Sequence, residues 1–169
     1  LATRQFYWLI VGTVLMVMTF SVDYQRLARW AFPTYFVMIV LLALVLVIGV
    51  SSGGSQRWLD LRFFSLQPSE LAKLTLVLVL AKTLRYYESG YSLMDLRMPL
   101  LLSAPVIGLV LMQPDLGTAV LILLIAMAVI VMSGLRVRSL LSLILATAIA
   151  LPIGWQFLRP YQKTRIWTF

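Results

Sequence analysis

The sequence predicts an all-α fold, a polytopic bundle of transmembrane helices. Hydrophobic residues make up 62% of the 169 residues and the mean hydropathy is +0.97, whereas soluble domains contain about 45–50% apolar residues. Only 12% of the residues are charged, and the apolar segments approach the roughly 20 residues that a membrane span needs. We therefore expect residues 1–169 to form a single transmembrane domain.

Six membrane spans can be placed along the chain. They lie at about residues 5–22, 30–50, 68–84, 99–112, 117–133 and 139–158. A polar loop, Ser51–Arg57, leads through Trp58–Leu66 to the third span, and the composition of Ser51–Ser55 is typical of a flexible linker. We expect Pro105 and Gly108 to interrupt the short fourth span.

From the two ends of the chain we interpret it as an internal piece of a larger protein. The first residue is Leu1 rather than Met, and the chain stops within a polar segment at Phe169. It also contains no histidine and no cysteine. This excludes, within these residues, His-activated nucleophiles, disulfides and the usual zinc sites. Acid–base chemistry would depend on Asp, Glu, Lys, Tyr or Arg.

Basic residues are divided evenly between the two membrane sides. An even number of spans puts both termini on one side, called side A, together with Arg57 and Gln113, and seven of the fourteen Lys and Arg residues fall on each side. The basic residues of the other side, side B, lie in plain hydrophilic turns, whereas those of side A alternate with aromatic residues. We therefore expect side B to be cytoplasmic and side A to bind a ligand. The net charge of +8 then favours lipid headgroups or an anionic lipid as partners, and not nucleic acid.

The third span begins with the most informative motif, Gln67-Pro68-Ser69-Glu70-Leu71-Ala72-Lys73. Proline favours the first helical position, so Gln67 becomes the N-cap and Glu70 faces the positive end of the helix. Lys73 opposes that dipole and enters the edge of the bilayer, where a charge is costly. Because Glu70 and Lys73 are three residues apart, they can pair on one face, and the pair either braces helices or lines a polar cavity.

A second motif, Gln113-Pro114-Asp115-Leu116-Gly117-Thr118, begins the fifth span. Asp115 is either a helix cap or a site residue, and two Gln-Pro helix starts on side A suggest a polar vestibule. Arg57 followed by Trp58 is either a snorkelling interfacial residue or a ligand contact. Lys163 and Arg165, in the final segment, are either interfacial anchors or ligand contacts.

Four blocks of this sequence resemble the signature blocks of the SEDS membrane proteins. They are Gly54-Ser55-Gln56-Arg57-Trp58-Leu59-Asp60-Leu61, the two Gln-Pro motifs, the second extended to Ala119, and Tyr161-Gln162-Lys163-Thr164-Arg165-Ile166. The first and the last resemble the elongation-type rather than the division-type members. The resemblance implies a ten-span protein, of which this chain would hold the second to seventh spans.

The resemblance also implies an activity. SEDS proteins polymerise peptidoglycan glycan strands from lipid II, on the outer face of the bacterial cytoplasmic membrane, together with a class B penicillin-binding protein. Side A would then face outward. The presumed catalytic aspartate of the family follows the fourth block, beyond Phe169, so no catalytic residue is assigned and we expect these 169 residues alone to be inactive.

The polar residues fit the expected reaction, in which a sugar hydroxyl attacks an anomeric carbon and a polyprenyl diphosphate leaves. Cations must stabilise the charge that develops on the diphosphate, and our hypothesis assigns this contact, or the shaping of its pocket, to Arg57, Lys73, Lys163 and Arg165. Glu70 would hold Lys73 charged and oriented. Gln67, Gln113 and Asp115 would line or support the vestibule or contact the sugar.

Two other functions fit the same pattern. A flippase or other transporter of lipid-linked precursors would use the polar vestibule and a broken fourth span. A non-catalytic scaffold for a penicillin-binding protein would need Glu70 and Lys73 only for stability or partner binding. The sequence identifies no metal ligands and leaves the cofactor open, a divalent cation included.

Overall fold

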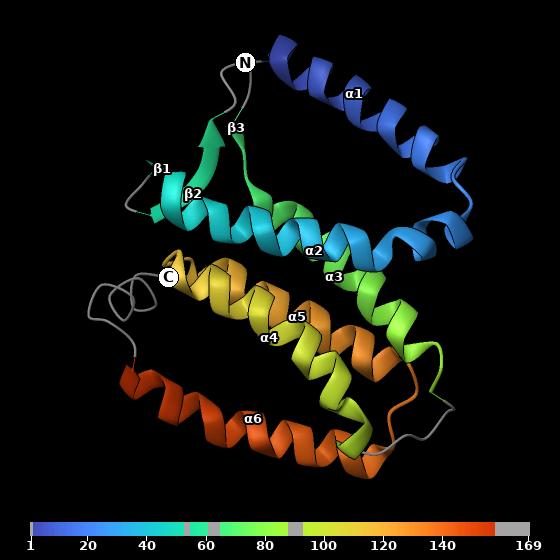
Figure 1. The fold of residues 1–169 in the computed structure, drawn as a ribbon, viewed down its shortest axis with the longest axis vertical. Coiled ribbons are helices and arrows are strands. Elements are labelled where there is room, and N and C mark those ends of the chain that lie inside the picture. Colours follow the sequence, from blue (N-terminus) through green and yellow to red (C-terminus); the bar gives the residue numbers. More distant parts are fainter. Residues whose placement is uncertain (1, 53–54, 61–64, 88–92, 158–169) are drawn as a thin grey trace.

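The computed structural model describes residues 2–52, 55–60, 65–87 and 93–157. The all-α prediction is confirmed, because long helices dominate the described residues (Figure 1). In chain order the elements are α1 (Ala2–Phe20), α2 (Tyr24–Ile48), β1 (Val50–Ser52), β2 (Ser55–Asp60), β3 (Ser65–Leu66), α3 (Pro68–Leu84), the short 3-10 helix η1 (Leu93–Leu96), α4 (Arg97–Met112), α5 (Leu116–Met132) and α6 (Val137–Phe157). Each predicted range overlaps one α-helix of the described residues, although α2 begins six residues before the predicted range 30–50 and Val50 lies in β1.

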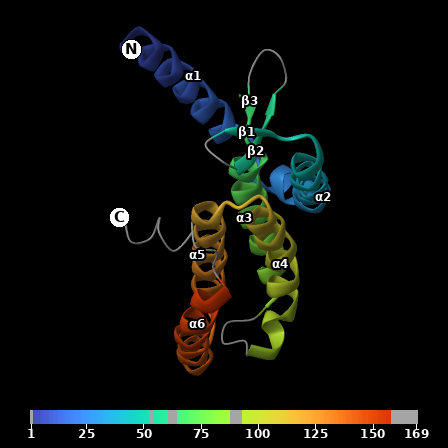
Figure 2. The same cartoon turned by 90° about the vertical axis from the view of Figure 1, so that its left-hand side faces the viewer.

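Helix α3 lies at the centre of the bundle and contacts α2, α4 and α5. Helices α1 and α6 lie at opposite edges of this group, and α1 tilts away from it (Figures 1 and 2). The buried core residues of α2 to α5 are Ala31, Leu42, Ala72, Leu76, Val79, Leu80, Leu84, Val106, Val110, Ala119, Ile122, Ala126 and Ile130. The core therefore belongs to the four central helices.

Small side chains allow the central helices to approach one another closely. Ala72 on α3 is fully buried, as are Ala119 and Ala126 on α5. In a bilayer, association of helices depends on van der Waals packing, because lipid tails are as apolar as the side chains that they replace. These three alanines belong to one buried cluster, in which α3 and α5 pack against each other.

Large apolar side chains cover the outer faces of the helices. Phe6, Val47 and Met132 are more than 60% exposed, and soluble monomers rarely expose extended apolar surfaces. Among the described residues, Tyr24–Ile48 and Met94–Met112 are long and apolar enough to cross a membrane, and Gln5–Phe20 and Leu116–Met132 are apolar but shorter. That all six helices span the bilayer stays a prediction.

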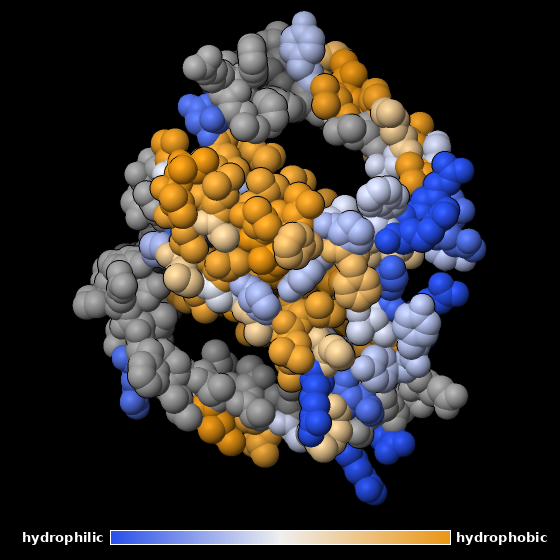
Figure 3. Space-filling view, in the orientation of Figure 1, coloured by the Kyte–Doolittle hydropathy of each residue, from blue (hydrophilic) through white to orange (hydrophobic). Residues whose placement is uncertain are grey.

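Hydrophilic residues gather along one edge of the bundle (Figure 3). This edge holds the α1–α2 turn, the end of α3 and the starts of α4 and α6 (Figure 1). Arg26, Arg29, Arg85, Arg97 and Arg136 belong to these segments. The basic residues assigned to side B from the sequence therefore lie at the same end of the bundle.

The predicted polar loop and flexible linker after the second span are wrong, because this segment forms a small antiparallel sheet in the order β1-β2-β3. Val50 pairs with Trp58, and Leu59 pairs with Leu66. In a strand, alternate residues share a face, so Arg57 and the buried Leu59 face the same way while Asp60 is exposed. The sheet packs through β2 against α2 and α3, and this contact orders a segment whose serine and glycine content resembles a linker.

The predicted interruption of the fourth span is also wrong, because α4 is one continuous helix with Pro105 inside it. Proline at position 105 removes the helical hydrogen bond to the carbonyl of Leu101, while two side-chain hydroxyls donate to carbonyls of neighbouring residues of α4. The Ser103 hydroxyl donates to the carbonyl of Pro99 at 2.8 Å, and the Tyr35 hydroxyl of α2 donates to the carbonyl of Leu102 at 2.7 Å. The second bond also ties α2 to α4. A Cβ added at Gly108 would meet no atom within 4 Å, so this glycine does not mark a break.

Candidate functional site

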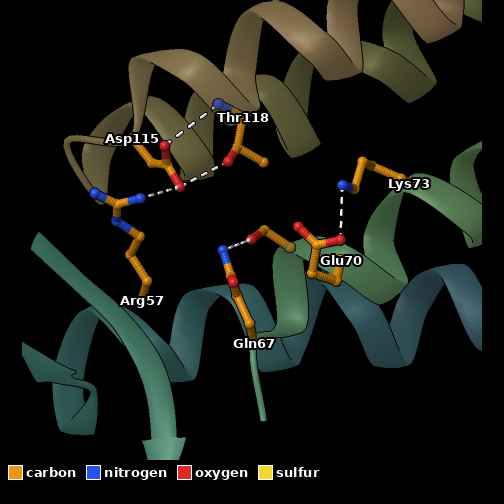
Figure 4. A network of polar contacts seen from close by, with 7 residues as sticks. Arg57, Gln67, Glu70, Lys73, Asp115 and Thr118 are labelled. Carbon is orange, nitrogen blue, oxygen red and sulfur yellow. Dashed lines mark hydrogen bonds and ion pairs between the residues drawn. The ribbon is translucent and has the colours of Figure 1, made fainter. Parts of the chain in front are cut away.

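Polar side chains from three elements meet at the end of the bundle opposite the basic edge. Strand β2 supplies Arg57, the start of α3 supplies Gln67 to Lys73, and the start of α5 supplies Asp115 and Thr118 (Figure 4). This grouping joins residues that lie as far apart in the sequence as Arg57 and Thr118. We call it the polar cluster, defined as Arg57, Gln67, Ser69, Glu70, Lys73, Asp115 and Thr118.

Asp115 caps helix α5 and is almost fully buried. Its Oδ1 accepts a hydrogen bond from the backbone N–H of Thr118 at 3.3 Å, and its Oδ2 accepts one from the Thr118 hydroxyl at 2.7 Å. Aspartate is among the preferred N-cap residues because it satisfies an otherwise unpaired helical N–H. Only 5% of Asp115 is exposed. The predicted cap is therefore present, but it is only part of the role of Asp115.

Arg57 forms an ion pair with the capping carboxylate. Its guanidinium Nη1 lies 3.2 Å from Asp115 Oδ2, and 23% of the Arg57 side chain is exposed. The pair joins the small sheet to the start of α5 (Figure 4). Such partly buried charges are stable only when they are paired and hydrogen-bonded, and the three donors around the Asp115 carboxylate meet this requirement. Arg57 is therefore held inside the protein, which differs from the interfacial snorkelling considered from the sequence.

Helix α3 begins as the sequence predicts, with Gln67 as N-cap and Pro68 in the first turn. The Gln67 side chain does not cap the helix. Its Nε2 instead donates to the hydroxyl of Ser69 at 3.1 Å, and Ser69 is 1% exposed. The backbone N–H of Glu70 donates to the Gln67 carbonyl at 3.1 Å. The first turn of α3 is thus fixed by local hydrogen bonds, which leaves the Glu70 side chain available for another partner.

Glu70 and Lys73 form the predicted ion pair along α3. Lys73 Nζ lies 2.8 Å from Glu70 Oε2. The two side chains differ in exposure, because Glu70 is 56% exposed and Lys73 only 18%. The Lys73 side chain is therefore mostly covered by the protein, whereas more than half of the Glu70 side chain is exposed. Two cations and two carboxylates, each cation paired, give the polar cluster a net formal charge of zero.

Gln113 lies next to the polar cluster but points into the core. It is 2% exposed, and its Nε2 donates to the carbonyl of Leu42 at 2.9 Å. This hydrogen bond connects the α4–α5 junction to α2. A buried amide without a partner would be costly, so the bond to Leu42 anchors the junction from which Asp115 projects.

An apolar groove opens between α2 and α3, with a volume of about 350 Å³. Trp30, Pro33 and Val37 line it on α2, and Leu71 and Leu74 line it on α3. Leu71 and Leu74 directly follow Glu70 and Lys73 in the sequence. The start of α3 therefore combines a polar pair with an apolar groove that is open at the surface of these helices.

Most of the predicted site residues are brought together. Arg57, Gln67, Glu70, Lys73 and Asp115 belong to the polar cluster, Gln113 supports it from the core, and Lys163 and Arg165 lie outside the described residues. Sequence reasoning missed Thr118 as a partner of Asp115. The signal was present, because an N-cap aspartate followed three residues later by threonine places a hydroxyl within reach of the carboxylate.

The arrangement can bind an anion at one end of a helical membrane bundle. Lys73 offers an ammonium with three donors, one of which reaches Glu70. Among residues 2–52, 55–60, 65–87 and 93–157, no three acidic side chains gather as metal ligands do. The described part of the chain therefore presents a cluster of paired charges at this end of the bundle.

Comparisons with known proteins agree with this architecture. The sequence profile of the FtsW, RodA and SpoVE cell cycle proteins matches residues 1–169. The chain is 38% identical over its full length to the peptidoglycan glycosyltransferase MrdB of Helicobacter pylori, of which it covers 46%. It superposes on a subunit of a peptidoglycan synthase complex, described as coordinating polymerization and crosslinking, with a TM-score of 0.82 and 39% identity over 97% of this chain and 49% of that subunit.

A second solved structure extends the likeness. The rod shape determining protein RodA of Thermus thermophilus is 39% identical and superposes with a TM-score of 0.73 over 88% of this chain and 49% of that protein. This match confirms the elongation-type resemblance predicted from the motif blocks. The chain spans about half the length of the relatives that it matches. With a profile match along every residue and helices that superpose on those of RodA, the chain belongs to the FtsW, RodA and SpoVE family of cell cycle proteins.

Proposed function

We propose that the protein is a peptidoglycan glycosyltransferase that polymerises lipid II into glycan strands for cell elongation. The observation that carries the proposal is the polar cluster, in which two ion pairs stand at the starts of two membrane helices. Charges near a bilayer are costly and usually serve a function. The relatives that carry the name peptidoglycan glycosyltransferase and share 38% of the sequence support the reaction class.

In this reaction the polar cluster serves the leaving-group side. Departure of a polyprenyl diphosphate requires cations near its oxygens, and we assign Arg57, Lys73, Lys163 and Arg165 to contact the diphosphate or to shape its pocket. Gln113 and Asp115 support the site through their buried hydrogen bonds, and Gln67 lines its edge. We assign no catalytic base within the described residues.

The lipid part of the substrate requires an apolar surface beside these charges. The groove between α2 and α3 provides one at the start of α3. We propose that it receives part of the polyprenyl chain while the diphosphate reaches the polar cluster. This arrangement matches a substrate that approaches from within the membrane.

The proposed setting follows from the same arrangement. We propose that the protein lies in the bacterial cytoplasmic membrane, among its lipids, with the end that carries Arg57 and Gln113 facing out. A class B penicillin-binding protein is the proposed partner, and the match to a complex that coordinates polymerization and crosslinking supports a partner of this kind. A transport function has less support, because α4 is a continuous helix and offers no break at mid-membrane.

The test is glycan polymerisation by the protein at its natural full length, purified with its penicillin-binding partner and incubated with lipid II. We expect polymer from the wild type and a sharp loss in Lys73→Gln. Lys82→Gln is the matched control, since Lys82 lies at the other end of the same helix, over the ring of Phe32, and should retain activity. A folded complex that moves lipid II across vesicles but forms no polymer would contradict the proposal in favour of transport.

A further inference from the structure

The two ion pairs of the polar cluster differ in how firmly each carboxylate is held. The Asp115 carboxylate accepts from Arg57, from the Thr118 hydroxyl and from the Thr118 N–H. Among the described residues, the Glu70 carboxylate has one polar side-chain partner, Lys73. The more firmly held carboxylate is also the less exposed: 6% of the Asp115 side chain is exposed, against 56% of that of Glu70.

These differences determine what happens when each pair opens. If Arg57 left Asp115, a carboxylate without access to water would lose its cation, which is strongly unfavourable. If Glu70 turned away from Lys73, its carboxylate would be hydrated at once, because more than half of its surface already faces the surroundings. An exposed ion pair contributes little to stability and opens readily. The Arg57–Asp115 pair is therefore fixed, and the Glu70–Lys73 pair is exchangeable.

The position of Lys73 determines which partner replaces Glu70 when the pair opens. Its side chain is only 18% exposed, so Lys73 gains less contact with water than Glu70 does when the pair opens. An ammonium in such a place favours a new anionic partner over hydration. The geometry points to Glu70 as a displaceable counter-ion: it occupies the anion position beside Lys73 in the empty protein and yields that position to the diphosphate of the lipid substrate.

This inference rests on the proposed function and assigns different roles to Lys73 and Arg57. Lys73 would take the diphosphate oxygens directly. Arg57, held by Asp115 and Thr118, would position the small sheet over the site. Glu70 would therefore compete with the substrate, whereas the sequence-based hypothesis has Glu70 holding Lys73 in place for it.

The test measures dissociation constants for farnesyl diphosphate, a short polyprenyl diphosphate, with the protein at its natural full length in nanodiscs. Glu70→Gln should tighten binding by about two- to fivefold, because an ion pair of this exposure must open before the ligand binds. Lys73→Gln should weaken binding more than about tenfold, through loss of a charge-assisted contact. Asp23→Asn is the matched control, because it removes an equal charge at the opposite end of the bundle and asparagine keeps the cap of α2, and it should leave binding unchanged.

A double variant separates displacement from a general gain of positive charge. The double variant Glu70→Gln/Lys73→Gln should bind no more tightly than Lys73→Gln alone. Tighter binding by the double variant than by Lys73→Gln would overturn the inference. Weaker or unchanged binding in Glu70→Gln, with the wild type binding normally, would overturn the displacement while leaving the proposed function intact. If neither the wild type nor any variant bound the diphosphate, both would fail.

Discussion

Replacing Asp115 tests how the small sheet is attached to the helical bundle. Asparagine is as good an N-cap as aspartate, so Asp115→Asn keeps the helix cap and removes only the charge that pairs with Arg57. Removing one partner of a fully buried pair costs about 3–5 kcal/mol, and the 23% exposure of Arg57 reduces this cost. We expect Asp115→Asn to lower the free energy of unfolding by about 1–3 kcal/mol.

Asp115→Ala removes the cap as well as the charge. Loss of an N-cap costs about 0.5–2 kcal/mol, so this variant should be less stable than Asp115→Asn by about that amount. The assay is reversible unfolding in detergent, with the wild type, both Asp115 variants, Arg57→Gln and the double variant Arg57→Gln/Asp115→Asn. The double-mutant cycle isolates the contribution of the ion pair.

The cycle gives a clear criterion. We expect a coupling free energy between Arg57 and Asp115 of about 1 kcal/mol or more, as contacting charges in a shared network show. A coupling below about 0.3 kcal/mol, the level of independent sites, would refute the contact between β2 and α5. Equal stability of Asp115→Asn and Asp115→Ala would refute the capping role.

Substitutions at three further positions test individual hydrogen bonds in the bundle. Thr118→Val should lower the free energy of unfolding by about 1 kcal/mol, because the Asp115 carboxylate loses a hydroxyl donor, and Thr118→Ser should restore it in the same unfolding assay. Gln113→Met should cost about 1–3 kcal/mol by leaving the junction without its bond to Leu42, and an unchanged melting temperature would contradict this. Tyr35→Phe should cost about 0.5–1.5 kcal/mol through loss of the bond to the Leu102 carbonyl, with lipid II polymerisation retained, and a large loss of activity at normal stability would show that this bond does more than join α2 to α4.

Helix positions followed well from hydropathy because apolar runs and helix starts are local features. The predicted range 68–84 is that of α3, and α5 differs from the predicted range 117–133 by one residue at each end. The start of α2 was predicted less well, because its first turns contain Arg26 and Arg29. A hydropathy profile does not detect a polar helical turn. The Asp23 cap, which accepts from Gln25, marks that start.

The small sheet escaped prediction because its signal is weak and its stabilisation is tertiary. Serine and glycine make up residues 51–55, and the following Arg57-Trp58-Leu59-Asp60 does not alternate between polar and apolar residues, so its periodicity does not indicate a strand. Packing of β2 on α2 and α3 orders it. Side-chain packing of this kind cannot be read from local composition.

In the candidate site, too, local contacts could be predicted from the sequence and long-range contacts could not. The Glu70–Lys73 pair follows from a spacing of three residues on one helix. The Arg57–Asp115 pair joins a strand to a helix in another part of the chain, so it required the fold. The inward orientation of Gln113 also required the fold, because only the position of α2 provides the Leu42 carbonyl.

The most direct test of the central proposal is photo-crosslinking of lipid II to the protein at its natural full length. The photoreactive group would be placed next to the diphosphate, and labelled peptides would be identified by mass spectrometry. The account predicts labelling within residues 67–73 and 113–118, reduced by unlabelled lipid II and by Lys73→Gln. Labelling confined to the opposite end of the bundle, around Lys82 and Arg85, would contradict the account.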